Sequence, residues 1–351
     1  MRSKGDDLAE IFYLMGVKPI WQKGSGKVTG LEIIPAAKLK RPRLDVVPRI
    51  SGFFRDAFPN LVNRIDQAVK MVAALNEPYE INILKKHVTA DMDQYTKDGM
   101  SKEEAFREAT FRVFGCPPGA YGAGVAELVE SKNWKTREDL GNNYIRYSSH
   151  AYGKGSYGKV KEDQFRKILS RMDVTVKNED SREYDMMSCT DFYNYYGGLI
   201  AASETLRGKL PFALVGDSSD PNRVKMRTTF EEAKHVFRAR LLNPKWLDGL
   251  KRHGYKGAGD ISKMMDVALG WDATADVVDD WMYEKIAQKY ALDPDMQEWM
   301  KEINPYALQN IQDKLLEAIS RGMWKNPDEK TEQELRDAYL EIEGEIEEIT
   351  E

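Results

Sequence analysis

The feature of this sequence that most restricts its fold is an alternation of strand-like and helix-like segments that stops part-way along the chain. Four short apolar segments rich in β-branched residues end in turn residues: LDVVPRISG (44–52), ATFRVFG (109–115), MDVTVK (172–177) and LPFALVG (210–216). Helical patterns lie between them, and such an alternation indicates a parallel sheet with both faces covered. We therefore predict an α/β fold with a largely parallel sheet and flanking helices.

Two of the intervening helices have clear sequence signals. Ser101 and Glu104 form a capping box at the start of one of them. In the other, Pro59 occupies the first turn, and an apolar stripe follows it at helical spacing: Leu61, Ile65, Ala68, Val69 and Val72.

The strand signal disappears after residue 217, and every later segment has a helical pattern. We therefore predict three parts: an N-terminal segment (1–42) at the edge of a domain, an α/β domain (43–217) and an all-helical C-terminal domain (218–351). The last helix combines a thin apolar seam with many acidic residues, and such a charge run is typical of a solvated face.

Composition excludes several classes of protein. The chain has 351 residues and a net charge of −5, whereas a protein that follows nucleic-acid phosphates is usually basic. No apolar run approaches the length of about 20 residues that a membrane span needs. The N-terminal residues do not form an export signal, and two cysteines provide no disulfide framework. We predict a cytoplasmic protein without a membrane span or a nucleic-acid partner.

The segment KGSGKVTGLEI (23–33) superficially resembles a phosphate-binding loop. The Walker pattern requires glycine where this chain has Trp21, and serine or threonine where it has Val28. We predict a turn that joins two short β segments, and no ATP site in this chain.

A second glycine-rich segment follows the strand at 109–115 and precedes a helical pattern. Gly119, Gly122 and Gly124 would let backbone N–H groups approach an anion at a helix N-terminus, with Tyr121 beside them. The glycine order differs from the dinucleotide fingerprint. A binding loop for a phosphate or carboxylate and a plain tight turn both remain open.

Two further sites have both a structural and a functional interpretation. Arg55 and Asp56 follow the strand at 44–52, where they pair with each other or face a ligand at the carboxyl edge of the sheet. His253 ends a helix that Asn243 caps and Pro244 begins. Its position suits the negative helix end, and a catalytic or metal role is the alternative.

The stretch VKNEDSREYDMMSCTDFYNYYGGL (176–199) combines five carboxylates with a cluster of aromatic residues. One interpretation is a loop whose arginine neutralises its neighbours above packed tyrosines. The other is a cleft wall for a large planar ligand with polar edges, where carboxylates act as bases or metal ligands. The polar or aromatic residues at issue are Asn178, Asp180, Arg182, Glu183, Asp185, Asp191 and Tyr193.

Several long segments point to one family. They are RPRLDVVPRISGFFRDAFPN, RVFGCPPGAYGAGV, VKNEDSREYD, YYGGLIAA, RARLLNPKWLDGLKRHGYKGAGDIS and WDATADVVDDWMYE. Together they resemble the CobN/magnesium-chelatase H-subunit family, the large tetrapyrrole-binding subunits of ATP-dependent metal chelatases. The likeness runs along essentially the whole chain, and the N-x-D-x-R-E-x-D form is closer to the cobalt branch.

The resemblance implies specific roles. Insertion of a divalent metal into the macrocycle removes two pyrrole protons, so Asp180, Glu183 and Asp185 are expected to be acid/base or metal-handling groups. His253 is a further candidate for the metal. The remaining candidates are expected to position the ring and its carboxylate arms: Arg55, Asp56, Asn178, Arg182, Asp191, Tyr193, Gly119 and Tyr121.

The resemblance also implies partners. Co²⁺ is the expected metal substrate, with Mg²⁺ or Ni²⁺ as alternatives, and AAA+ partner subunits are expected to use the ATP. Family members are several times longer, so this chain resembles their C-terminal part only, and the fragment alone is expected to need the missing N-terminal part for activity. Two rival hypotheses are a non-catalytic scaffold that docks the ATPase subunits and an independent acid/base hydrolase.

Overall fold

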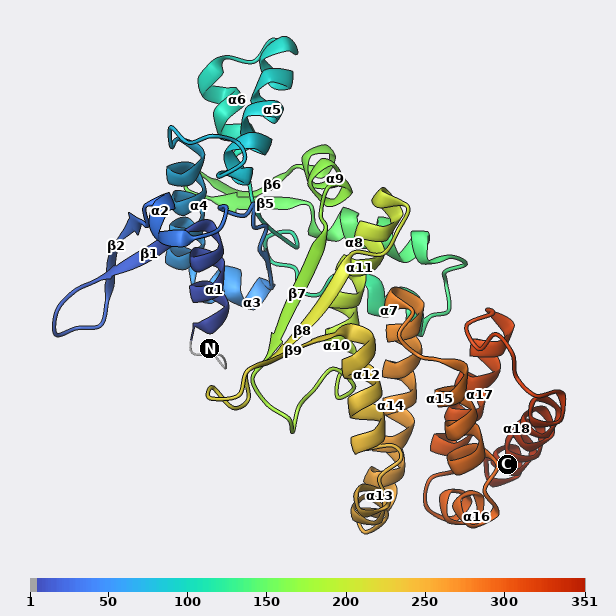
Figure 1. Ribbon diagram of the computed structural model, residues 1–351. Helices are drawn as coiled ribbons and strands as arrows, with labels where there is room; N and C mark the ends of the chain where they lie inside the picture. The colour runs from blue at the N-terminus through green and yellow to red at the C-terminus, as the bar shows by residue number, and fades with distance from the viewer. Residues whose placement is uncertain (1–4, 351) are drawn as a thin grey trace. The chain divides into compact units, whose positions relative to one another are not determined.

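The computed structural model describes residues 5–350, and the contacts within it divide the chain into two compact units. Unit 1 runs to Gly122 and resumes over Ile145–Ile168, whereas unit 2 consists of Ala123–Tyr144 and the chain from Leu169 onward. The α/β class with a helical C-terminal region is confirmed (Figure 1). The predicted domain boundaries after residues 42 and 217 stay predictions.

Unit 1 contains two small sheets and the helices around them. Its helices are α1 (Asp6–Met15), α2 (Ala36–Leu39), α3 (Gly52–Ala57), α4 (Pro59–Ala73), α5 (Ile83–Lys97), α6 (Lys102–Ala109) and most of α9 (Glu162–Ser170). Its strands are β1 (Val17–Trp21), β2 (Val28–Ile33), β3 (Arg49–Ile50), β4 (Val113–Gly115), β5 (His150–Gly153) and β6 (Ser156–Val160).

The core of unit 1 follows the predicted apolar stripe. Ile65, Ala68, Val69 and Val72 of α4 are fully buried, Leu61 is half-buried, and Pro59 is the first residue of the helix. The capping box that opens α6 is confirmed, and so is the predicted turn between β1 and β2. In the larger sheet, ordered β3-β4-β5-β6, only β3 and β4 run parallel.

Unit 2 combines one sheet with most of the helices. Its strands are β7 (Val174–Glu179), β8 (Phe212–Asp217) and β9 (Lys225–Thr228). Its α-helices are α7 (Val125–Glu130), most of α8 (Arg137–Ser148), α10 (Thr190–Phe192), α11 (Gly198–Arg207), α12 (Thr229–Ala239), α13 (Pro244–Lys251), α14 (Gly254–Ala275), α15 (Asp280–Ile286), α16 (Pro294–Ile303), α17 (Pro305–Ser320) and α18 (Glu329–Thr350). Two short π-helices are η1 (Tyr193–Gly197) and η2 (Ala287–Ala291).

The four predicted strand segments account for both parallel pairs of the structure, β3 with β4 and β7 with β8. The other strand pairs are antiparallel, so the sheets are mixed. The prediction that strands end at residue 217 was wrong, because β9 pairs with β8. The segment KMRT has no apolar alternation, and its extended form depends on a neighbouring strand.

The helical region has its own core. The long helix α14 is buried along most of its length and packs against α13 and α17. In α18 the predicted apolar seam is partly confirmed, because Leu335 and Ile342 are fully buried. Among residues 5–350, none of the helices combines the length and the apolar character that a bilayer crossing requires.

Candidate functional site

The candidate site lies at the carboxyl end of the parallel pair β7–β8. Side chains alternate along β7, so Thr175 and Glu179 point into unit 2 and are buried, whereas Val174 and Val176 point to the opposite face. The loop that follows β7 leads to α10. This alternation places the carboxyl group of Glu179 inside the protein where the strand ends.

An arginine of this loop binds two acidic residues from other elements. Arg182 donates from Nε to Oδ2 of Asp217, the last residue of β8, at 3.0 Å, and its Nη1 contacts Oε1 of Glu232 on α12. Arg227 of β9 donates to the other oxygen of Glu232 at 2.7 Å. Because the Glu232 side chain is fully buried, these two guanidinium groups supply its neutralising charge.

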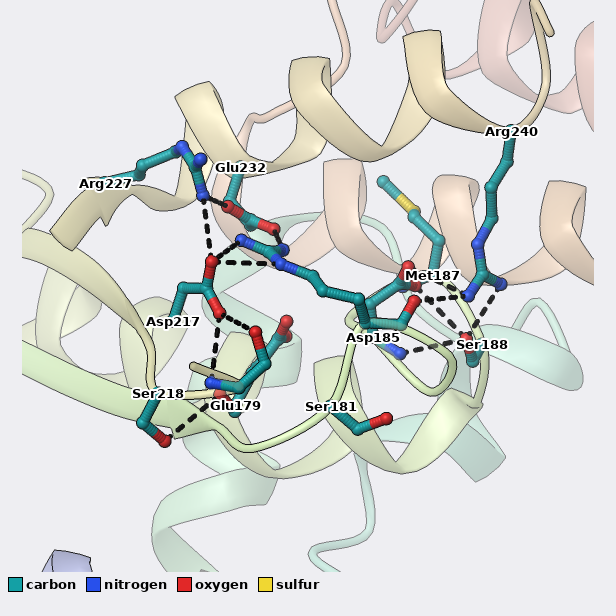
Figure 2. A network of polar contacts seen from close by, with 12 residues as sticks. Glu179, Ser181, Asp185, Met187, Ser188, Asp217, Ser218, Arg227, Glu232 and Arg240 are labelled. Atoms are coloured by element: carbon teal, nitrogen blue, oxygen red, sulfur yellow. Dashed lines mark hydrogen bonds and ion pairs between the residues drawn. The ribbon is translucent and has the colours of Figure 1, made fainter. Parts of the chain in front are cut away.

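A second arginine fixes the far end of the same loop. Arg240, which follows α12, lies 3.0 Å from Oδ2 of Asp185 and donates to the backbone oxygen of Glu183 at 2.9 Å. The other oxygen of Asp185 accepts hydrogen bonds from the backbone N–H of Met187 and the hydroxyl of Ser188, both at 3.1 Å. Both Asp185 oxygens are therefore occupied by groups of the protein (Figure 2).

Glu179 is the carboxyl group of this network that lacks a cationic partner. It is 4% exposed, and its Oε2 atom has no hydrogen-bond partner among the residues that the structure describes. Burial raises the pKa of Glu179 to about 8, and repulsion from Glu232 and Asp185 adds to the effect. In Figure 2 its carboxyl group lies between Asp217 and Asp185. Burial and the neighbouring carboxylates therefore favour the protonated form of Glu179.

The protonation of Glu179 balances the charges of the network. Three arginines face three other carboxylates, namely Asp185, Asp217 and Glu232. Burial raises the pKa of Asp185 although Arg240 opposes it, whereas the hydrogen bond from Ser219 and the contact with Arg182 lower the pKa of Asp217 against the effect of burial. A group with a pKa near neutrality can both take up and release a proton.

The structure brings only some of the predicted residues of the stretch 176–199 into the network. It joins Arg182 and Asp185 in the network, leaves Asp180 half-buried on the loop, and leaves Glu183 and Asp191 exposed. Asn178 lies on the opposite face of β7, where its Oδ1 atom would be 2.2 Å from a Cβ atom on Gly216.

Tyr193, which was predicted to position the tetrapyrrole, lies in the core of unit 2. Its side chain is fully buried, and its ring packs so closely against α14 that a Cβ atom on Gly270 would lie 2.4 Å from it. A ligand would reach Tyr193 only if this packing opened.

Five ionisable members of the network were not predicted. They are Glu179, Asp217, Arg227, Glu232 and Arg240. Glu179 and Asp217 end strand segments, and that position was a usable signal. Glu232 lies on the amphipathic helix α12 and Arg240 directly follows it, and in the sequence neither residue differs from an ordinary surface charge.

The predicted pair in unit 1 forms a separate cluster. Arg55 binds both oxygens of Asp56 at 2.7 Å and donates to the backbone oxygens of Pro117 and Ala120. The hydroxyls of Tyr121 and Tyr157 also donate to Asp56, at 2.9 and 3.3 Å.

This arrangement determines the charge state and the accessibility of the pair. The hydrogen bonds from Arg55 lower the pKa of Asp56 to about 2. Arg55 lines a hollow of about 350 Å³ together with Tyr152 and Tyr157. Its donors already bind protein oxygens, so the cluster holds the loop after β4 in place.

The glycine-rich segment forms tight turns. Gly119, Gly122 and Gly124 have φ values of 78°, 88° and 77°, which only glycine adopts without strain. The backbone N–H groups of Val125 and Ala126 at the start of α7 donate to the side-chain oxygen of Asn194 at 3.0 and 3.2 Å. These donors are therefore already used within the protein, and the structure favours the turn over an anion site at this helix.

His253 is exposed just before α14, and Asn243 caps the preceding helix as predicted. Within residues 5–350, no group of three His, Cys, Asp or Glu side chains is arranged to hold a metal ion.

Comparison with known proteins identifies the family. A family model described as CobN/Magnesium Chelatase matches residues 1–331 of the chain. The chain belongs to this family. It is 53% identical, over 99% of its length, to an uncharacterized protein of Methanocaldococcus jannaschii, and 42% identical, over 98% of its length, to the aerobic cobaltochelatase subunit CobN of Pseudomonas aeruginosa.

A solved structure agrees with this assignment. The chain superposes on the catalytic subunit of cobaltochelatase from Mycobacterium tuberculosis with a TM-score of 0.93, at 42% identity and over 97% of its length. The chain spans only 28% of that protein and 28% of each of the two relatives above.

Proposed function

We propose that this chain is the C-terminal part of the large subunit of an ATP-dependent metal chelatase, which inserts a divalent metal into a tetrapyrrole. The observation that carries the proposal is the buried network at the carboxyl end of β7 and β8, which fixes a loop bearing two accessible carboxylates. Family membership and the similarity to proteins named as cobaltochelatase subunits support the reaction class.

The finer assignments form part of the same proposal. Co²⁺ is the metal substrate and a corrinoid or porphyrin precursor is the ring, because the similar proteins include cobaltochelatase subunits. Carboxylate oxygens would also accept Mg²⁺ or Ni²⁺. AAA+ partner subunits hydrolyse the ATP, and the rest of the large subunit completes the ring site. The chain functions in the cytoplasm.

The proposed chemistry is a proton-for-metal exchange. The ring loses two pyrrole protons while one divalent cation enters, so charge is balanced when two bases accept the protons. Asp180 and Glu183 are the acceptors, since one is half-buried and the other exposed on the loop. Asp185 holds the loop, because its oxygens already bind Arg240, Met187 and Ser188.

The polar edge of the ring is positioned by groups beside this loop. Asn178 and Asp191 flank the loop and offer an amide and a carboxylate to the ring and its arms. Arg182 acts indirectly, because its guanidinium group binds Asp217 and Glu232 and thereby determines where the loop begins.

A non-catalytic scaffold is the second candidate function. It is favoured because the arginines of both clusters already bind carboxylates of this chain. In that case the chain holds the other parts of the chelatase together, and the ring is bound elsewhere in the large subunit.

Replacement of the two proposed acceptors separates these functions. In the complete large subunit with its ATPase partners, Asp180→Ala combined with Glu183→Ala is expected to lower kcat for metal insertion about 100-fold, because general-base catalysis contributes about that much. The rate is followed by the absorption change of the ring. Glu103→Ala with Asp163→Ala, two carboxylates of unit 1 outside the site, is the matched control. Unchanged activity in the double variant would support the scaffold.

A further inference from the structure

The sheet β7-β8-β9 has two unlike faces. One face lies against the helices of unit 2: Thr175, Ala213 and Val215 are buried there, and the hydroxyl of Tyr196 in η1 donates to the backbone oxygen of Leu214 at 2.7 Å. This is the face that also carries Glu179 and the ionic network.

The opposite face is apolar and uncovered. Val174, Val176, Phe212 and Met226 are 48%, 39%, 58% and 49% exposed. The strand register makes these side chains one continuous surface, because Val174 pairs with Phe212, Val176 with Leu214, and Gly216 with Met226. We call this surface, comprising Val174, Val176, Phe212, Leu214 and Met226, the outer face.

An uncovered apolar face is unusual for a parallel pair of strands. Parallel strands occur almost only in sheets whose two faces are both covered, and contiguous exposed apolar surface marks an interaction site. The segment LPFALVG is apolar at nearly every position, as expected for a strand that is buried on both faces. The segment MDVTVK alternates instead, and its apolar residues Val174 and Val176 lie on the outer face. The sequence of these strands therefore fits a sheet with a covering layer on the outer face.

The length of the similar proteins indicates what forms that layer. In the solved cobaltochelatase subunit, the region with this fold is 28% of one polypeptide, so the remaining 72% (100% minus 28%) is covalently tethered to it. A tethered segment has a high effective concentration at this surface, which favours it over a second copy or a separate protein.

We propose that the outer face is the docking surface for the remaining part of the chelatase large subunit. This inference rests on the proposed function. The partner presents an apolar surface to Val176, Phe212 and Met226, which are exposed on this face. Docking at this face would place the partner against the strand that leads into the Asp180–Asp185 loop.

Thiol labelling of the outer face tests the proposal. Val176→Cys is introduced together with Cys189→Ser, while the natural Cys116 is buried and stays in place. The probe is a charged maleimide, and mass spectrometry measures its rate of reaction with the isolated chain. The same measurement is made on a full-length subunit in which this chain replaces the matched 28% of Pseudomonas aeruginosa CobN.

The expected result is rapid labelling of the introduced thiol in the isolated chain and labelling at least tenfold slower in the full-length subunit. Leu340→Cys on α18 is the matched control, because Leu340 is equally apolar and 64% exposed. Its labelling rate is expected to be the same in both proteins. Val176→Lys with Phe212→Lys is expected to leave the isolated chain folded by circular dichroism, and to make the two parts of the full-length subunit melt separately.

Four results would overturn the proposal. Equal labelling in both proteins would show that the remaining part does not cover the face, and independent melting of the unaltered full-length protein would mean the same. Slow labelling in the monomeric isolated chain would show that the chain itself covers the face. Labelling that slows with concentration, together with a dimer by light scattering, would assign the face to a second copy. None of these readouts depends on Asp180 or Glu183. Failure of the docking proposal can therefore be distinguished from failure of the proposed chemistry.

Discussion

The two units carry arginine–carboxylate clusters at the ends of their parallel strand pairs, and the clusters differ in burial and in charge. In unit 1, Arg55 binds the exposed Asp56 and two backbone oxygens beside it. In unit 2, three arginines bind three carboxylates, and a fourth carboxyl group, Glu179, is buried among them.

An arginine–carboxylate pair has a different role where water can reach it than where water is excluded. Water can replace Arg55 at the exposed oxygens of Asp56, so the first cluster is a clamp on a loop. Water cannot reach Glu232, which is fully buried, so removal of its arginines leaves a charge with no compensation. The second cluster therefore has a strict charge balance, and the proton on Glu179 maintains it.

The largest effect is expected from Arg182→Ala. This change removes a cation from Asp217 and Glu232 together, and the loss of one partner from a buried pair costs about 4 kcal/mol. Urea unfolding followed by tryptophan fluorescence measures the effect in unit 2, because six of the seven tryptophans lie there. Arg336→Ala on α18, whose pair with Glu332 is exposed, is expected to cost at most about 0.5 kcal/mol. Equal effects of the two changes would remove the distinction between the clusters.

The next effect concerns Glu179 and pH. The folded protein binds this proton more tightly than the unfolded chain, because burial raises the pKa of Glu179 from its ordinary value of 4.5 to about 8. The free energy of unfolding therefore falls as pH rises from about 4.5 to about 8, as far as this group is concerned. Above pH 8 the contribution of Glu179 no longer changes with pH. Glu179→Gln keeps the neutral shape, and it is expected to remove this decline and to raise the free energy of unfolding at pH 8.5 by at least about 2 kcal/mol, since each pKa unit of the shift corresponds to about 1.4 kcal/mol.

Urea unfolding at pH 5, 7 and 8.5 measures this difference. Glu183→Gln on the same loop is the control, because Glu183 is exposed, and its pH dependence is expected to match that of the unaltered protein. Parallel pH profiles for the unaltered protein and Glu179→Gln would show that Glu179 is already ionised at neutral pH.

The smallest effect is expected in unit 1. Arg55→Met leaves Asp56 hydrated but deprives the backbone oxygens of Pro117 and Ala120 of a donor, which costs about 1–2 kcal/mol. Hydrogen exchange is expected to become faster in the segment 116–121 and to stay unchanged in 180–188. Faster exchange in both segments would mean that the two clusters are not independent.

Much of the fold was predictable because the signals are local. The stripe of α4, the capping box of α6 and the four strand segments follow from residue spacing within a few turns. The hairpin β5–β6 and the strand β9 were missed, since SYGKV and KMRT show no clear apolar alternation. Their extended form comes from pairing with a neighbouring strand.

The candidate site was predictable only in part. The sequence placed Arg182 and Asp185 beside the end of a strand, and the structure joins both to one network. It did not indicate that Asp185 is held by Arg240, 55 positions further along (240 minus 185). The burial of Tyr193 against Gly270 was equally invisible, because both residues belong to helical patterns that have several possible orientations.

The sequence by itself determined the family, the alternation of strands with helices and the position of an acidic loop at a strand end, because these depend on the order and spacing of neighbouring residues. The tertiary structure decided which carboxyl group keeps its proton. That outcome depends on burial and on charges brought together from β7, β8, β9 and α12, and electrostatic interactions in a protein interior depend on distance in space rather than on separation along the chain.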